Sequence, residues 1–393
     1  MPPRYSREIE QPIVMGDSLK DQFRTSPCEA SCPAGNPIQK MQSLVEKGRF
    51  GEALRYLRAR NPFPGVTGRV CPHFCQAKCN RDRLEGCVNT RALERAAYDH
   101  APKGIEPFTR APETGKHVAV VGGGPAGMTA AYFLSLLGHD VTVYESGPVL
   151  GGIPRYAVPD FRLPRDVVDR EIGWILETGV RACVNVTVGK DISFAELRAS
   201  SDAVVVATGA TPLIPTFIKG VGDYPVITTH DVLSRKVTIP KGTVCILGGG
   251  EVACETAEMI MADARPNSFA TTGSIGDVEV TLVEMQPQLM TGVCLPNRNI
   301  ALASLRREGV KSYINSKVLE VTEHDVKIQH KDGTEEWLKG FDYIILGLGS
   351  RKYDPLSEEL KAFVPEVHVI GDAVKPGQSS DAMHQGFHIG YEL

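Results

Sequence analysis

The segment HVAVVGGGPAGMTAAYFLSLLGHDVTVYES, residues 117–146, decides the fold of this chain. Its apolar start at 117–121 predicts a buried strand, and the glycines that follow predict a tight turn into a helix. Gly122 permits the turn, Gly124 lets the backbone approach a pyrophosphate, and Gly127 lets the helix pack closely on the strand. The segment therefore predicts a strand–turn–helix unit that binds a dinucleotide, with the pyrophosphate at the N-terminus of the helix.

An acidic residue follows this unit at the spacing that a dinucleotide site requires. A second strand is expected at 140–144, and Glu145 ends it, about 20 residues after the glycines, where an acid accepts hydrogen bonds from ribose hydroxyls. Pro125 and Ala126 lie in the first turn of the expected helix and complete the predicted binding residues of this unit. The strand, the helix and the acid together argue against a glycine-rich turn without a ligand.

A second fingerprint, VCILGGGEVACETAEMI, occupies residues 244–260. Ala253 stands where the third glycine would be, which is a permitted variant of the motif. The chain can therefore hold two nucleotides. The binding residues that this second unit predicts are Gly248, Gly250, Glu251 and Val252.

The acidic partner of the second fingerprint is Glu284, in VEVTLVEM at 278–285. It comes later than usual because a polar stretch at 263–277 lengthens the connection. An acid here accepts from a free 2′-hydroxyl and repels a 2′-phosphate, whereas a site for NADP requires an arginine nearby. We therefore favour NADH over NADPH, although Arg298 could still fold back toward the ribose.

Six of the ten cysteines lie in the first 90 residues, in CEASCPAG (28–35) and VCPHFCQAKCNRDRLEGC (70–87). Secreted disulfide scaffolds are short, so this group is better interpreted as metal ligands. Zinc prefers paired CxxC motifs, which are absent, whereas thiolates followed by proline in a helical domain are common around iron–sulfur clusters. A zinc site and free buried thiols remain alternatives.

The other four cysteines are scattered singly at Cys183, Cys245, Cys254 and Cys294. They form no CxxC or CxxxxC pair, so chemistry of the thioredoxin or lipoamide reductase type is not expected. With 393 residues, 42% of them hydrophobic, and a net charge of −4, the chain can bury several cores. No apolar run reaches 18 residues, and Lys and Arg are dispersed among acids. We expect a cytoplasmic protein with no membrane span and no nucleic-acid partner.

The positions of helix-capping residues and prolines indicate how the chain is organised. Residues 36–58 predict two helices, with Asn36 as the N-cap of the first and Pro37 in its first turn. The proline-rich stretch at 101–116 predicts a linker. Strands and helices then alternate to the end, which predicts parallel sheets with ligands at the carboxyl ends of the strands.

Three further segments carry a family resemblance: GGIPRYAVPDFRLPRDVVDREI (151–172), ATG (207–209) and VHVIGDAVKPGQSSDAMHQGFHIGYEL (367–393). They resemble the two-dinucleotide flavoprotein family that includes the small subunit of NADPH-dependent glutamate synthase and the flavin/nicotinamide part of dihydropyrimidine dehydrogenase. The resemblance implies FAD at the first fingerprint and a nicotinamide at the second, and it puts Asp372 beside the FAD ribityl and pyrophosphate. The second fingerprint is more similar to the corresponding half of 2,4-dienoyl-CoA reductase and trimethylamine dehydrogenase. Further binding residues are Gly152, Thr208, Gly209, Gly349 and Gly371.

The cysteine-rich segment is similar to the N-terminal domain of the same family, which normally binds two [4Fe–4S] clusters. Here one cluster has lost half of its ligands, because no CxxC precedes Cys28. The family's other cluster uses three cysteines and a Gln or Glu, which by motif fall on Cys32, Cys71, Cys75 and Glu94.

The remaining cysteines of this segment have weaker assignments. By the resemblance, Cys28 and Cys79 would be remnants of the lost cluster, although a re-formed four-cysteine site that includes either residue stays open. Cys87 has no assigned ligand role, and we expect it to be a small buried residue.

The resemblance also implies the fold and the domains. We expect an α/β protein with two Rossmann-like domains preceded by a small α-helical iron–sulfur domain. The iron–sulfur domain would cover 1–110, the FAD domain 111–239 and 341–393, and an inserted NAD(H) domain 240–340. His384 and Asp381 lie in the segment that caps the flavin in the family, and a surface histidine and a helix N-cap are equally good interpretations.

Together these features predict an NAD(H)-linked flavoprotein subunit that transfers electrons between NAD(H), FAD and a [4Fe–4S] cluster, with cofactors rather than side chains performing the hydride step. Its partners would be ferredoxin-like or iron–sulfur catalytic subunits of a larger complex, of the glutamate synthase or phenylglyoxylate dehydrogenase kind. A free-standing NADH:acceptor oxidoreductase that reduces ferredoxin, a quinone or a dye is the alternative. A redox- or NADH-sensing binding protein is a third possibility.

Overall fold

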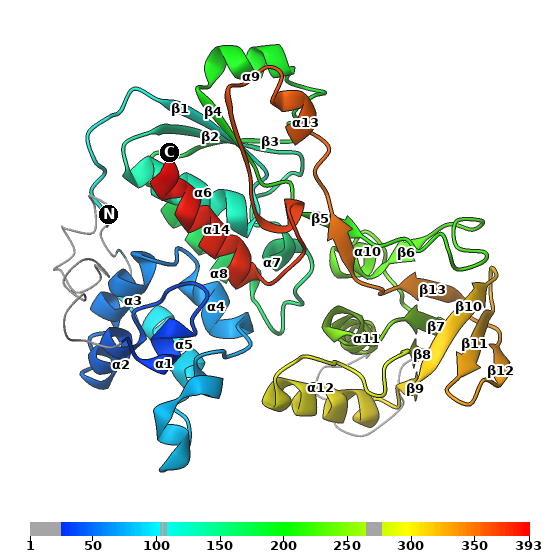
Figure 1. The fold of residues 1–393 in the computed structure, drawn as a ribbon. Helices are drawn as coiled ribbons and strands as arrows, with labels where there is room; N and C mark the ends of the chain where they lie inside the picture. The colour runs from blue at the N-terminus through cyan, green and yellow to red at the C-terminus, as the bar shows by residue number, and fades with distance from the viewer. Residues whose placement is uncertain (1–24, 103, 105–107, 265–276) are drawn as a thin grey trace. The chain divides into compact units, whose positions relative to one another are not determined.

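The structure, a computed structural model, describes residues 25–102, 104, 108–264 and 277–393. Contacts divide the chain into two compact units (Figure 1). Unit 1 comprises 1–155, 160–210 and 352–393, and unit 2 comprises 156–159 and 211–351. Parts of the predicted linker and of the polar stretch at 263–277 lie outside the described residues.

Unit 1 begins with a small group of short helices. Its elements are α1 (Pro27–Ala30), α2 (Ile38–Glu46), α3 (Phe50–Arg58), α4 (Pro64–Val70), η3 (Gln76–Lys78), η4 (Asn80–Arg83) and α5 (Thr90–Asp99). The prediction of two helices in 36–58 is confirmed by α2 and α3. On α3, Ala53, Leu54 and Leu57 share one buried face, as their spacing predicts.

The predicted N-cap of α2 is wrong. Pro37 occupies the cap position, and the Asn36 side chain instead donates to the buried carboxylate of Glu94 at 3.0 Å. A buried carboxylate needs hydrogen-bond donors from the protein, because water does not reach it.

The rest of unit 1 is built on a five-stranded parallel sheet in the order β15-β4-β1-β2-β3. The strands are β1 (His117–Val121), β2 (Asp140–Glu145), β3 (Arg181–Val184), β4 (Ala203–Val206) and β15 (Glu366–Val369). The helices are α6 (Pro125–Leu136), α7 (Ile153–Tyr156), α8 (Arg165–Leu176), α9 (Phe194–Ser200), α13 (Ser357–Leu360), η5 (Gly371–Ala373) and α14 (Ser379–Glu392). The strand predicted at 117–121 is confirmed residue by residue.

Helices cover both faces of this sheet. On one face α14, red in Figure 1, runs along α6. On the other face Leu197 from α9 and Leu360 from α13 pack on Val204 and Val206 of β4. The central strands β1 and β4 are therefore apolar almost throughout, as expected for a parallel sheet buried on both faces.

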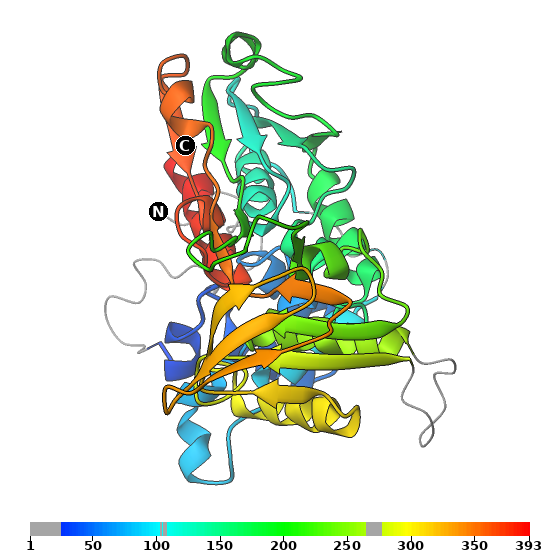
Figure 2. The ribbon, with the colours of Figure 1, turned by 90° about the vertical axis from the view of Figure 1, so that its right-hand side faces the viewer.

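Unit 2 holds a second parallel sheet, in the order β6-β13-β7-β8-β9. Its elements are β6 (Ile227–Thr228), α10 (Thr229–Leu233), β7 (Gly242–Leu247), α11 (Glu251–Asp263), β8 (Val278–Val283), α12 (Leu295–Arg307), β9 (Lys311–Tyr313) and β13 (Tyr343–Leu346). An antiparallel sheet of β10 (Ser316–Val321), β11 (Val326–His330) and β12 (Glu335–Leu338) covers one face of it (Figure 2).

The chain passes between the units at β5 (Ala210–Pro212) and β14 (Ser350–Lys352), which pair with each other. Unit 2 thus begins earlier than the predicted insert at 240–340, because β6 pairs with β13 and carries 211–239 with it. The separate N-terminal domain at 1–110 stays a prediction, since the helical segment falls inside unit 1. Every helix in the described ranges is too short or too polar to span a membrane.

Candidate functional site

The first glycine-rich turn joins β1 to α6 and leaves open space at the N-terminus of the helix. Gly122 has φ of 114°, and a Cβ there would lie 2.3 Å from the Ala207 carbonyl oxygen, so only glycine fits. At Gly124 a Cβ would meet only Gly152 Cα, at 3.8 Å. Packing alone does not require glycine at position 124, which leaves room for the close approach of a pyrophosphate that the motif predicts.

Glu145 is fixed beside this turn by the protein backbone. Its Oε2 accepts from the Gly123 amide at 2.8 Å and its Oε1 from the Gly147 amide at 2.6 Å. The carboxylate therefore lies at the carboxyl end of β2, next to the first turn of α6 that begins with Pro125 and Ala126. This is where a ribose would meet it.

The second turn repeats the arrangement inside unit 2. Glu284 Oε2 accepts from the Gly249 amide at 2.7 Å, and Oε1 accepts from the Gln286 amide at 2.7 Å. A Cβ on Gly250 would meet nothing within 4 Å, so the N-terminus of α11 is open as well. Gly248 forms the turn, and Glu251 and Val252 form the first turn of α11.

Arg298 does not reach toward Glu284 in this structure. Its Nε donates to the Leu289 carbonyl at 3.0 Å.

The other expected flavin residues lie at the carboxyl ends of β4 and β15 in unit 1. Thr208 Oγ1 donates to the Tyr353 carbonyl at 2.6 Å, and the Gly209 carbonyl accepts from the Tyr353 amide at 3.0 Å. Asp372 follows Gly371 in η5 and accepts from the Gly377 amide at 3.0 Å. Burial raises the pKa of Asp372. Gly349 belongs to unit 2, next to β14.

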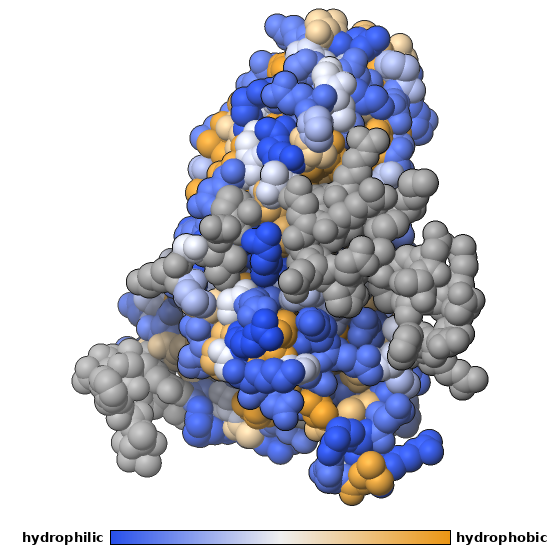
Figure 3. Space-filling view, turned by 90° about the vertical axis from the view of Figure 1, so that its left-hand side faces the viewer, coloured by the Kyte–Doolittle hydropathy of each residue, from blue (hydrophilic) through white to orange (hydrophobic). Residues whose placement is uncertain are grey.

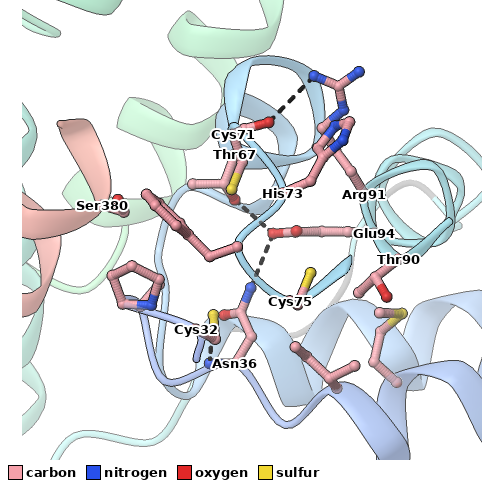
Figure 4. Close-up of a pocket in the computed structure, with 15 residues that line it drawn as sticks. Cys32, Asn36, Thr67, Cys71, His73, Cys75, Thr90, Arg91, Glu94 and Ser380 are labelled. Atoms are coloured by element: carbon pink, nitrogen blue, oxygen red, sulfur yellow. Dashed lines mark hydrogen bonds between the residues drawn. The ribbon is translucent and has the colours of Figure 1, made fainter. Parts of the chain in front are cut away.

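Cys32, Cys71, Cys75 and Glu94 line one cavity in the helical part of unit 1 (Figure 4). Each comes from a different element: Cys32 follows α1, Cys71 ends α4, Cys75 precedes η3, and Glu94 lies on α5. The structure thus brings together the four side chains that the resemblance assigns to one cluster.

The cavity disfavours charge on its own groups. Burial raises the pKa of the Cys32 and Cys71 thiols to about 12, and it also raises the pKa of Cys75. Burial raises the pKa of Glu94 to about 7, opposed by hydrogen bonds from Thr67 and Asn36. A bound iron centre would supply the positive charge that lets such thiols ionise.

Three polar atoms that line this cavity are buried without a partner: Asn36 Oδ1, His73 Nε2 and Ser380 Oγ. Buried polar atoms are normally paired, so a polar occupant is implied. Within the described ranges no three His, Cys, Asp or Glu side chains converge on a point that suits a single ion. A cubane binds each protein ligand to a different iron, so its ligands are spread around a cavity in this way, and the donor set fits it.

The remaining cysteines lie elsewhere. Neither Cys28 nor Cys79 lines the cavity, although Cys28 is near enough to Cys75 to raise the pKa of that thiol. Cys87 is exposed, so the expectation of a buried residue was wrong; it follows η4, where consecutive side chains from Asn80 to Cys87 face solvent.

One helix connects this cavity with the flavin-side loop, which the sequence did not reveal. Ser380 on α14 lines the cavity, while Gln385 on the same helix accepts from the Gly371 amide at 2.7 Å. Asp381 accepts from the Gln378 amide at 3.0 Å, so it caps α14. His384 is exposed, and its ring lies near the backbone of Pro33, next to Cys32.

Two family models match the chain. Residues 116–386 match the model described as pyridine nucleotide-disulphide oxidoreductase. Residues 22–104 match the model described as dihydropyrimidine dehydrogenase domain II, 4Fe–4S cluster. The second match includes every residue that lines the cavity except Ser380.

Individual relatives cover part of the chain. It is 34% identical over 259 residues to NADPH-Fe(3+) oxidoreductase subunit beta of Geobacter sulfurreducens, which is 62% of this chain and 38% of that protein. It is 34% identical over 242 residues to the glutamate synthase [NADPH] small chain of Bacillus subtilis, 58% of this chain and 49% of that protein. The matches thus span less than half the length of these relatives.

A solved structure of 2-naphthoyl-CoA reductase has the same fold, with a TM-score of 0.66 and 22% identity over 91% of this chain and 53% of that one. The two family models imply that the chain binds a flavin and a pyridine nucleotide and holds a 4Fe–4S cluster. The chain belongs to the pyridine nucleotide-disulphide oxidoreductase family and is an NAD(P)H-dependent FAD oxidoreductase with an iron–sulfur domain at its N-terminus.

Proposed function

We propose that this chain is the NADH-linked electron-transfer subunit of a larger redox complex. FAD binds at the β1–α6 turn, NADH at the β7–α11 turn, and one [4Fe–4S] cluster in the cavity of the helical segment. Electrons pass between these groups and a ferredoxin-like or iron–sulfur catalytic subunit.

The observation that carries this proposal is the cavity lined by Cys32, Cys71, Cys75 and Glu94, together with Ser380 of α14. Because α14 also holds the Gly371 amide through Gln385, one rigid helix fixes the distance between the flavin loop and the cluster. Such fixed spacing is what an electron-transfer protein has to provide, since the redox chemistry belongs to the cofactors.

The roles of the side chains are binding and orientation. When bound, the cofactors supply two-electron hydride chemistry on the nicotinamide side and one-electron chemistry at the iron–sulfur centre. Glu145 and Glu284 orient the two riboses, and the open amides at the starts of α6 and α11 hold the pyrophosphates. Thr67 and Asn36 hold Glu94 in place through hydrogen bonds.

Glu284 supports NADH as the nicotinamide. Its carboxylate accepts hydrogen bonds from two backbone amides at the end of β8. To turn away from a 2′-phosphate, it would have to break these bonds, which costs free energy. The relatives described above are named for NADPH, so this residue is the specific argument for NADH here.

The partner is proposed to dock beside the cluster cavity. Phe74 lines the cavity and is also 37% exposed, so the cavity wall reaches the protein surface at this residue. The neighbouring segment from Ala77 to Cys87 is largely exposed and includes Leu84 at 81%. On the face shown in Figure 3, the coloured residues are mostly hydrophilic, with scattered hydrophobic groups.

Cofactor analysis of anaerobically purified protein tests the proposal. We expect one FAD and about four irons per chain, the content of a single cubane. Cys32→Ser or Cys71→Ser should remove the iron and keep most of the FAD, because the flavin loops are built from other elements. Cys183→Ser on β3, outside the cavity, is the matched control and should keep both.

Two results would contradict the proposal. Zinc in place of iron would remove the electron path, and about eight irons per chain would mean that a second cluster binds.

A further inference from the structure

Two histidines on α14 form a pair that the redox function does not use. His384 and His388 are four residues apart on the helix, both are exposed, and their Nε2 atoms lie 3.0 Å apart. The ring centroids are 4.4 Å apart with the ring planes at 79°. Residues at this spacing share one face of a helix, so both rings are presented to solvent together.

The separation of the two nitrogens matches a chelate. Imidazole nitrogens bind zinc-like ions at about 2.0–2.1 Å, so two of them on one ion, at angles between a right angle and a tetrahedral one, are about 2.8–3.4 Å apart. An ion between Nε2 of His384 and Nε2 of His388 therefore requires almost no movement of the helix. In its absence one ring donates to the other.

The surroundings of His384 suit a metal ligand. The backbone of Pro33 lies close enough to its ring to act on it as a hydrogen-bond acceptor. Burial and the neighbouring His388 lower the pKa of His384, which favours the neutral ring that binds metals. Asp381, one turn earlier on α14, is close enough to act on His384 through its negative charge.

We propose that His384 and His388 form a binding site for one divalent transition-metal ion of the zinc or nickel class, with water completing its coordination. The site lies on the helix that bears Ser380 in the cluster cavity and Gln385 on the flavin-side loop. The backbone of Pro33, next to Cys32, lies near the His384 ring. Occupancy therefore couples metal availability to the rigidity of the segment between flavin and cluster.

The test is a titration of the cofactor-loaded protein with Ni²⁺, with the heat of binding measured by calorimetry. We expect one site per chain that His388→Asn or His384→Asn weakens at least about tenfold, because each change leaves a single imidazole. His100→Asn is the matched control, since it removes an exposed histidine at the end of α5. Ni²⁺ should also raise the thermal midpoint of the wild-type protein and of His100→Asn, but not that of His388→Asn.

Equal Ni²⁺ affinity in the wild type and both α14 variants would overturn the proposal. So would a loss of Ni²⁺ affinity in His100→Asn as large as the loss in the α14 variants. The cofactor content of each variant, measured in parallel, shows that the fold is kept. The measurement needs no NADH and no electron acceptor, so its result does not depend on whether the proposed electron-transfer function is correct.

Discussion

The same residue-level arrangement recurs at both nucleotide sites. In each, a glutamate at the end of the second strand accepts from the amide of the middle glycine of the turn: Glu145 from Gly123 at 2.8 Å, and Glu284 from Gly249 at 2.7 Å. The carboxylate is thus fixed before a ribose arrives. Fixed acceptors discriminate between ligands more sharply than mobile ones, because they cannot adapt to a wrong group.

Nicotinamide preference depends on this fixed acid. We expect the ratio of kcat/KM values to favour NADH over NADPH at least tenfold, the effect of about 1.4 kcal/mol of polar discrimination. Glu284→Ala should bring the ratio close to one, because it removes both the acceptor for the 2′-hydroxyl and the repulsion of a 2′-phosphate. Glu279→Ala, at the exposed start of β8, should leave the ratio unchanged. Equal use of both cofactors by the wild type would mean that Glu284 does not reach the ribose.

The sequence identified the cysteines of the cavity but not the polar residues around them. Spacing and family resemblance assign Cys32, Cys71 and Cys75, and the fold brings them together. The sequence pattern predicts a helix cap at Asn36 and assigns no role to Ser380. Asn36 contacts Glu94, which lies 58 positions later in the sequence, and Ser380 lies more than 300 positions after Cys32 and Cys71. Local sequence patterns do not encode contacts over such separations.

At the scale of elements, the packing of α14 on α6 holds the carboxyl-terminal segment against the flavin half of the fold. Gly386 makes this close approach possible, because a Cβ there would lie 2.5 Å from the Ala126 carbonyl oxygen and 2.9 Å from the Ala130 amide. Both atoms belong to α6 backbone, which cannot move aside without disturbing the first fingerprint.

Gly386→Ala should therefore lower the unfolding free energy by about 1–3 kcal/mol, the usual range for overpacking. Gly173→Ala in α8 is the control: a Cβ there meets nothing within 4 Å, so the change should be neutral or stabilise by up to about 1 kcal/mol. Thermal unfolding of the flavin-loaded proteins measures both. Similar midpoints for the two variants would show that α14 can shift on α6.

A buried carboxylate joins the helical segment to the flavin half. Glu171 on α8 accepts from the Gly65 and Val66 amides at the start of α4, the helix that ends at Cys71. Burial raises its pKa from 4.5 to about 8. Between these values the folded protein holds a proton that the unfolded chain has released, so the unfolding free energy falls as pH rises.

We expect the thermal midpoint of the wild type to decline from about pH 5 to pH 8 for this reason. Glu171→Gln keeps an oxygen acceptor for one of the two amides and cannot ionise, so its decline should be smaller. Glu177→Gln, an exposed site on the same helix end, should follow the wild type. A wild-type midpoint that rises over this range would mean that Glu171 is ionised in the folded protein.

For the whole molecule, the order of strands and helices was predictable and the limits of the units were not. Buried parallel strands have apolar runs that the sequence displays, and the glycine turns fix where each sheet begins. The limits depend on pairing between distant strands: β6 joins the second sheet through β13, more than 100 residues later, so 211–239 belongs with unit 2. A two-residue strand such as β6 has no sequence signal of its own.

The last prediction separates a subunit from a free-standing enzyme. If the cluster is the exit to a partner, Cys75→Ser should lose the iron yet still allow NADH to reduce the bound FAD at close to the wild-type rate, because that step uses the two fingerprints alone. Dye reduction from the flavin should persist, whereas electron exchange with the native partner should fall, since one relay is missing. Stopped-flow absorbance and turnover of the reconstituted complex measure the two steps separately.

Two outcomes would contradict this prediction. Full turnover of the complex with Cys75→Ser would mean that electrons leave from the flavin itself. Physiological rates for the isolated wild type with a soluble acceptor would favour a free-standing reductase.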